Sequence, residues 1–137
     1  MISLSAPAHA VQYLSVSEAQ KLAFPSASFT EVQPGRVWKT SSGGIFVLDH
    51  VIGKHLYIDY AVSIVGGLVH RVDILQYRES YGGEVRSPSW LAQFVGKTSS
   101  SPLQVGADIR NISGATLSSM HVTEGVKRIL AAYGHLR

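Results

Sequence analysis

A run of three small residues, Ser113-Gly114-Ala115, stands directly before Thr116 and a segment with helical spacing. The first N–H groups of a helix have no partner within the helix, so they are donors for a ligand at that end. Glycine and alanine keep the backbone approachable. The pattern favours a phosphate beside the threonine, although a purely structural loop of small residues has the same composition.

Other chemistries leave no comparable pattern in the chain. The absence of cysteine removes disulfides, thiolate metal sites and thiol catalysis. Neither a GxxxxGK run followed by Ser or Thr nor a GxGxxG run occurs, and the six histidines lack H-x-x-x-H spacing, so nucleotide fingerprints and a metal site are not expected. The net charge of +3 comes without a Lys/Arg block, which gives no support to a nucleic-acid surface.

Helical spacing of apolar residues predicts a helix behind the threonine, from about 119 to 133. Its apolar positions are Val122, Val126, Ile129, Leu130 and Tyr133. Thr116 is then expected in the loop that leads into this helix, and Gly125 is expected to let the helix pack closely on a sheet.

Two shorter helices are expected earlier in the chain. Ser15 and Glu18 have the spacing of a capping box, which predicts a helix that ends near Ala23. Ser87-Pro88, as N-cap and first helical residue, predicts a second helix over 88–95 with a C′ glycine behind it.

Period-2 alternation predicts the strands. The clearest signal is LYIDYAVSI, residues 56–64, and its partner is LVHRVDILQY, residues 68–77. Two more short strands are expected near 36–40 and 45–51, between glycine-rich turns. Together the elements predict an α+β domain over residues 15–137, an antiparallel sheet with short helices packed against it.

Paired residues of an antiparallel hairpin must share a face of the sheet. A three-residue loop, Val65-Gly66-Gly67, pairs Ile64 with Leu68, whereas a two-residue turn would pair Ile64 with Val69. We therefore predict the longer loop, with Gly67 in the left-handed conformation.

Residues 1–14 are expected to form an N-terminal tail. Ala8-His9-Ala10 fits the small-x-small pattern of a signal-peptidase site, so the tail is either the remnant of an export signal or an ordinary chain end. No apolar run approaches the roughly 18 residues of a transmembrane helix.

The segment ISGATLSS, residues 112–119, resembles the flavinylation motif of the FMN-binding domain family, known from subunits of the sodium-translocating NADH:quinone oxidoreductase and Rnf complexes. In that family a flavin transferase joins the phosphate of FMN to the motif's last threonine through a phosphoester. GGLVHRVDILQYRESYGGEV and WLAQFVGK are similar to further family segments, and the resemblance covers about residues 45–133. It implies that Thr116 carries covalent FMN.

The resemblance also implies the neighbouring contacts of the flavin. Ser113, Gly114 and Ala115 would enter the transferase and afterwards surround the phosphate, while Leu117 and Ser118 would lie beneath the ribityl chain. The flavin loop, implied along the isoalloxazine ring, consists of Glu79, Ser80, Tyr81, Gly82 and Gly83.

Several side chains keep two interpretations. Trp90 either stacks on the flavin ring or belongs to the core, and His121 either reaches the phosphate or ring edge or lies at the surface. Lys97 and Arg110 either add positive charge near the phosphate or are solvated surface groups. Asp73, like Asp59 and Glu84, is expected to face outwards.

The function implied by the resemblance is that of a small exported flavoprotein, periplasmic in a bacterium, that carries covalent FMN and shuttles electrons. The implied partners are a flavin transferase that uses FAD, a membrane-bound redox partner and a downstream acceptor; membrane association would come through partners alone. Such a protein is a carrier more than an enzyme. The alternative is a non-covalent FMN-binding or apo regulatory module, favoured by Arg110, which stands where many members have an acidic residue.

Overall fold

The computed structural model describes residues 13–80 and 83–136. The predicted signal remnant at 8–10 and two residues of the flavin loop, Tyr81 and Gly82, lie outside the described residues. Among the described residues, no helix combines the length and hydropathy that a membrane-spanning segment needs.

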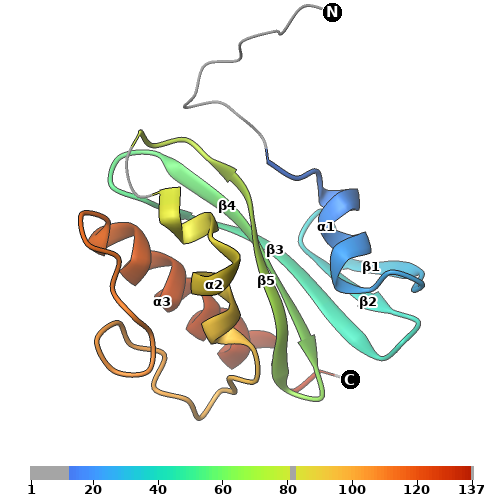
Figure 1. The fold of residues 1–137 in the computed structure, drawn as a ribbon. Helices are drawn as coiled ribbons and strands as arrows, with labels where there is room; N and C mark the ends of the chain where they lie inside the picture. Colours follow the sequence, from blue (N-terminus) through green and yellow to red (C-terminus); the bar gives the residue numbers. More distant parts are fainter. Residues whose placement is uncertain (1–12, 81–82, 137) are drawn as a thin grey trace, which may run out of the picture.

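A five-stranded antiparallel sheet forms the middle of the molecule, with its strands in the order of the sequence (Figure 1). The strands are β1 (Phe29–Gln33), β2 (Val37–Thr40), β3 (Gly44–Ile52), β4 (Tyr57–Val65) and β5 (Leu68–Tyr77). The last four confirm the predicted strands. Strand β1 is missing from the prediction because almost all of its residues are exposed, so it has no apolar face to recognise.

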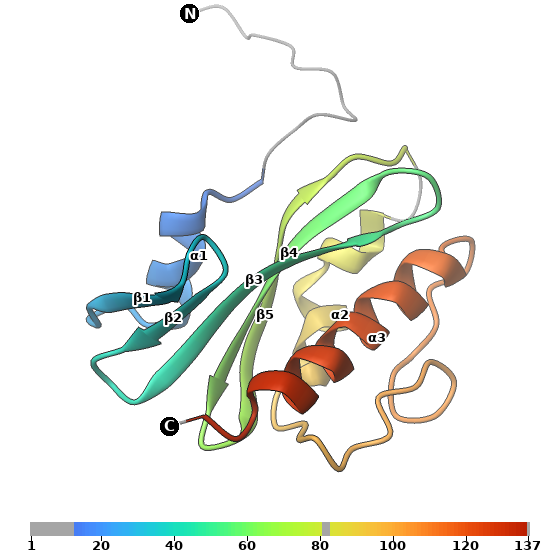
Figure 2. The same cartoon turned by 180° about the vertical axis from the view of Figure 1, so that it is seen from behind.

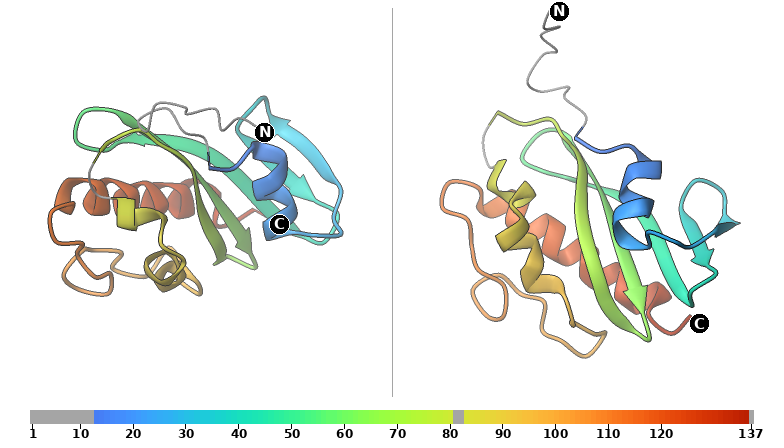
Figure 3. Two further views of the ribbon diagram at one scale, coloured as in Figure 1. Left: turned by 45° about the horizontal axis from the view of Figure 1, so that its top comes forward. Right: turned by 45° about the vertical axis from the view of Figure 1, so that its right-hand side comes forward.

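Helices cover both faces of the sheet, and the predicted α+β class is confirmed (Figures 2 and 3). Helix α1 (Val16–Ala23) covers one face over a small core, while α2 (Pro88–Leu91) and α3 (Thr116–Tyr133) cover the other face over the large core. Short 3-10 turns flank α2 at Gly83–Arg86 and Ala92–Phe94. Both faces of β4 are therefore buried, with Tyr60 and Val62 in the large core and Ala61 in the small one.

The capping box of the first helix and the glycine behind the second are confirmed, but the helix predicted over 88–95 is α-helical only as far as Leu91 and continues as a 3-10 turn to Phe94. Ser15 Oγ accepts the Glu18 N–H at 3.0 Å and the Glu18 carboxylate accepts the Ser15 N–H at 2.8 Å, which confirms the capping box. Gly96, behind the second helix, is left-handed with φ +85°. Ser87 occupies the N-cap of α2, but its hydroxyl makes no capping bond and pairs with Ser89 Oγ instead.

The predicted three-residue loop between β4 and β5 is wrong. Val65 pairs with Leu68 around a two-residue Gly66-Gly67 turn, in which both glycines are left-handed, as predicted for Gly67. Ile64 consequently pairs with Val69, and a β-bulge after that pair brings Val62 opposite Val72 and Tyr60 opposite Ile74. The bulge supplies the extra residue that we assigned to the loop, so the shared-face rule is satisfied inside the strand.

Asp73 is buried, contrary to the expectation that it faces outwards. The chain before α1 runs beside the edge of β5, where the Tyr13 and Leu14 N–H groups donate to the Leu75 carbonyl. Tyr13 and Leu14 line a hollow together with Asp73, and Arg71 Nε donates to both Asp73 carboxylate oxygens, at 3.0 and 2.8 Å. The ion pair compensates the burial of the carboxylate.

Helix α3 packs directly on β4 at a glycine, as the sequence predicts. A Cβ atom added to Gly125 would clash with the Tyr60 hydroxyl, and would lie 2.8 Å from Tyr60 Cζ and 3.0 Å from Val51 Cγ1. Tyr60 is fully buried and its hydroxyl donates to Asp49 Oδ2 at 3.2 Å. Burial, and then the charge of Asp49, raise the pKa of Tyr60 far above its ordinary value, so the phenol stays protonated.

We predict that Gly125→Ala destabilises the domain by about 1–3 kcal/mol, because the added methyl group must displace the tyrosine ring or the helix. In an exposed helical position the same change would stabilise the fold by roughly 1 kcal/mol. Denaturant unfolding of Gly125→Ala, Tyr60→Phe and the double variant is the measurement. Because Tyr60→Phe removes the clashing oxygen, the double variant should recover part of the stability that Gly125→Ala loses. Strictly additive changes in the free energy of unfolding would contradict the contact between Gly125 and Tyr60.

Candidate functional site

Thr116 is the first residue of α3, so the prediction that it lies in the preceding loop is wrong. Ala115 is the N-cap and makes no side-chain capping bond, while Gly114 before it is left-handed with φ +81°. The added helical turn contains few apolar residues, which explains why apolar spacing places the helix start too late. The first N–H groups of α3 thus point towards the loop of small residues, and the side chain of Thr116 is exposed.

A cleft of about 250 Å³ lies at this helix end. Its lining residues are Lys54, Tyr77, Glu79, Gly114, Ala115, Thr116, Leu117 and Ser118. The structure therefore brings the threonine loop and the beginning of the predicted flavin loop together, although they are far apart in the sequence. In the ribbon the start of α3, the β3–β4 loop and the end of β5 meet at one end of the sheet (Figures 1 and 2).

Glu79 has a defined structural task in this cleft. Its Oε2 accepts the backbone N–H groups of Lys54 at 2.8 Å, His55 at 2.5 Å and Leu56 at 2.8 Å, all in the β3–β4 loop. Burial alone would raise the pKa of Glu79, but the three backbone donors outweigh it and hold the pKa below its usual value. The ionised carboxylate therefore closes this loop onto the end of β5.

Ser80 and Gly83, the other described residues of the predicted flavin loop, are not among the residues that line the cleft. Ser80 is exposed, and Gly83 begins a 3-10 turn in which a Cβ atom would meet the Arg86 guanidinium at 2.6 Å. Ser113 is exposed directly before the cleft residues.

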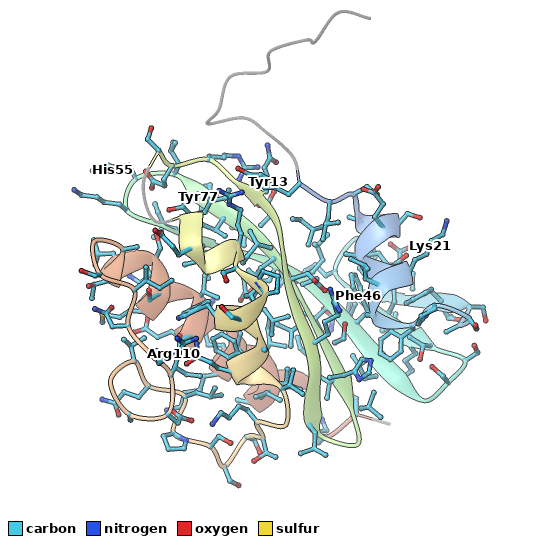
Figure 4. The ribbon with its side chains drawn as sticks, viewed as in Figure 1. Tyr13, Lys21, Phe46, His55, Tyr77 and Arg110 are labelled. Atoms are coloured by element: carbon cyan, nitrogen blue, oxygen red, sulfur yellow. The ribbon has the colours of Figure 1, made fainter. Side chains whose placement is uncertain are left out.

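Tyr77 and Lys54 line the cleft, yet the sequence predicts neither as a site residue. Tyr77 is buried at the end of β5, with its hydroxyl hydrogen-bonded to Ser118; burial raises the pKa of Tyr77, while this bond opposes the rise. Its place in the strand alternation signals a core residue, and nothing local indicates a cleft. Figure 4 shows Tyr77 at the same end of the sheet as His55 of the β3–β4 loop.

Trp90 lies in the large core, which decides between its two interpretations. It is 3% exposed, contacts Phe94 edge to face with ring centroids 5.2 Å apart, and its Nε1 donates to the Arg110 carbonyl at 2.8 Å. Trp90 thereby anchors the segment before the threonine loop to α2.

His121 faces the β3–β4 loop from the other side. Its Nδ1 lies 2.8 Å from the Ile52 carbonyl and 3.1 Å from the Gly53 carbonyl, a geometry in which the ring N–H donates to the backbone. The histidine therefore joins the second turn of α3 to the end of β3.

The two cations that the sequence leaves open are both engaged in the segment between α2 and α3. Lys97 pairs with Asp108 at 3.2 Å, and the backbone N–H of Arg110 donates to Gln93 Oε1 at 2.7 Å. Arg110 Nη2 also lies 3.3 Å from the Ser89 carbonyl. Figure 4 shows Arg110 beside α2.

Comparison with known proteins adds one finding. Residues 53–131, more than half of the chain, match the model of the FMN-binding domain family. This range begins in the β3–β4 loop and ends within α3, so it contains all residues that line the cleft. No curated protein matches the chain.

We predict that Glu79→Gln lowers the free energy of unfolding at neutral pH by about 1–3 kcal/mol, because charged acceptors strengthen backbone hydrogen bonds. A carboxyl group whose pKa is depressed by folding stabilises the native state above its unfolded pKa, and this stabilisation disappears as the pH falls through the folded value. The difference between wild type and Glu79→Gln should therefore shrink below about pH 4.5.

Urea unfolding between pH 3 and pH 7 measures this difference, with exposed Glu84→Gln as the matched control. If the difference in the free energy of unfolding between wild type and Glu79→Gln stays constant from pH 3 to pH 7, the negative charge of Glu79 does not contribute.

Proposed function

Because the chain belongs to the FMN-binding domain family, and is thus a flavin-binding protein, we propose that it holds FMN by a phosphoester bond to Thr116. The observation that carries the proposal is the position of Thr116, an exposed hydroxyl at the N-terminus of an 18-residue helix and inside a cleft. The unpaired N–H groups and the positive end of the helix dipole favour a phosphate at this place.

In the proposed modification, a flavin transferase supplies FAD and Thr116 is the acceptor. Thr116 Oγ attacks the phosphorus on the flavin side of the pyrophosphate, the P–O–P bond breaks, and AMP leaves. The threonine proton passes to a base of the transferase. The chain gains one FMN less one water, and the phosphodiester keeps one negative charge beside the helix N-terminus.

The size of the cleft supports a covalent bond. Its volume of about 250 Å³ lies below the roughly 300–1,000 Å³ of pockets that enclose ligands of drug size. The flavin ring would therefore extend out of the cleft, past Leu117, which lines it and is 45% exposed. Met120, on the next turn of α3, is 38% exposed. A ring that is only partly covered binds weakly by itself, and a phosphoester removes dissociation altogether.

The proposed role is that of an electron carrier between a membrane-bound redox partner and a downstream acceptor. Bound FMN supplies the redox chemistry, and the chain supplies its attachment and surroundings. A ring edge at the rim would be accessible to both partners. The proposed location is the periplasm or another compartment outside the bacterial cytoplasm, where a flavin that dissociates would be lost.

A second candidate is a module that binds FMN without a covalent bond, or an apo-domain with a regulatory role. The observation that favours it is Arg110, which stands six positions before the threonine, where many family members are acidic.

We predict that Thr116→Val abolishes the gain of FMN mass when the chain is co-expressed with a flavin transferase of its source organism, because valine lacks the acceptor oxygen. The threonine is exposed at the first helical position, so the free energy of unfolding should change by less than about 0.5 kcal/mol. Intact mass under denaturing conditions, with peptide mapping, is the measurement.

Thr30→Val, at an exposed position of β1, is the matched control and should be modified like wild type. Covalent flavin on Thr116→Val, or an unmodified wild type beside a transferase that modifies another substrate, would refute the attachment at Thr116.

A further inference from the structure

Lys54, in the β3–β4 loop, brings a positively charged side chain to the cleft. It is exposed, and it lines the cleft together with Thr116. None of the ion pairs within residues 13–80 and 83–136 involves Lys54, whereas Lys97 is paired with a carboxylate. Its ammonium group is therefore available for an anionic ligand.

The loop that carries Lys54 is held from two sides. Glu79 accepts three of its N–H groups, including that of Lys54 itself at 2.8 Å, while the His121 ring donates to the carbonyls at the end of β3. Within the loop, the Gly53 N–H donates to the Leu56 carbonyl at 2.7 Å. The backbone of Lys54 is thus fixed relative to the first turns of α3.

Gly53 lets the loop approach this closely. A Cβ atom at Gly53 would lie 3.1 Å from Glu79 Oε2 and 3.2 Å from Ser118 Oγ. The loop therefore lies against both the carboxylate that closes it and the helix that starts with Thr116.

We propose that Lys54 is the cationic partner of the FMN phosphate in this cleft, and that Glu79 is a positioning residue that holds Lys54 there. The proposal rests on the proposed flavin site. Glu79 cannot itself attract a phosphate because both are anionic, and its charge is already compensated by the three backbone donors. Lysine adds a compact, strongly donating charge opposite the helix N-terminus, so the phosphate would be bound from two sides.

The assignment makes a specific claim about phosphate, which riboflavin lacks. We titrate the apo chain, produced without a transferase, with FMN and with riboflavin, and follow flavin fluorescence. Wild type should prefer FMN, and Lys54→Gln should bind FMN about fivefold more weakly with unchanged riboflavin affinity, as for the loss of an exposed ion pair. The FMN preference of wild type should also weaken as salt is added.

Lys39→Gln, an exposed lysine on β2, is the matched control and should behave as wild type. An FMN-to-riboflavin affinity ratio in Lys54→Gln equal to that of wild type would overturn the assignment, as would a wild type without any preference for FMN.

The positioning role of Glu79 is tested by the same ratio, which a merely destabilised fold would leave unchanged. Glu79→Ala should reduce the FMN preference, Glu79→Gln should restore part of it because an acceptor oxygen remains, and Glu79→Ala/Lys54→Gln should be no worse than Lys54→Gln alone. Additive losses in the double variant would refute an action of Glu79 through Lys54.

Intact mass tests the covalent attachment of FMN independently of the affinity ratio. A wild type that gains FMN, with Lys54→Gln retaining full FMN preference, means that the attachment stands and the Lys54 assignment fails. If Lys54→Gln loses the preference for FMN and wild type gains no mass, the Lys54 assignment stands and the covalent attachment fails.

Discussion

The contact between Gly125 of α3 and the buried ring of Tyr60 determines where the helix lies on the sheet. A helix of 18 residues that is anchored by a glycine in its middle can neither rise from the sheet nor shift along it without breaking close packing. Its N-terminus, and with it Thr116, therefore stays at the end of the sheet where the β3–β4 loop and the end of β5 meet. The cleft is a consequence of that placement.

Electrostatics at this end are arranged around one carboxylate. Glu79 is an anion held by three backbone N–H groups, so it closes a loop without placing uncompensated negative charge in the cleft. Apart from Glu79, the one charged side chain among the described lining residues is that of Lys54, and the helix N-terminus adds partial positive charge. An arrangement of this kind suits an anionic ligand. Glu79 has the structural role in it, and the binding role is the one proposed for Lys54.

The small volume of the cleft is compatible with the covalent attachment proposed for FMN. A shallow site suffices when the ligand is attached by a covalent bond, because affinity is then no longer limited by the area that the protein covers. In the proposed electron carrier, an incompletely covered flavin ring would be open to redox partners. Exposed Leu117 and Met120, on the first turns of α3 with the threonine, would give such a ring an apolar neighbour without enclosing it.

The sequence by itself determined the local features of this protein: the capping box at Ser15, the alternating strands, the glycine at 125 and the small-residue loop before Thr116. These depend on residues that are near one another in the chain, where period and turn chemistry leave a visible pattern. Only the tertiary structure decided that Glu79 closes a loop, that Lys54 and the threonine line one cleft, and that a bulge instead of a longer turn sets the β4–β5 register. Those outcomes depend on packing between distant segments, and a single side chain that meets its partner across the fold leaves no periodic signal in the sequence.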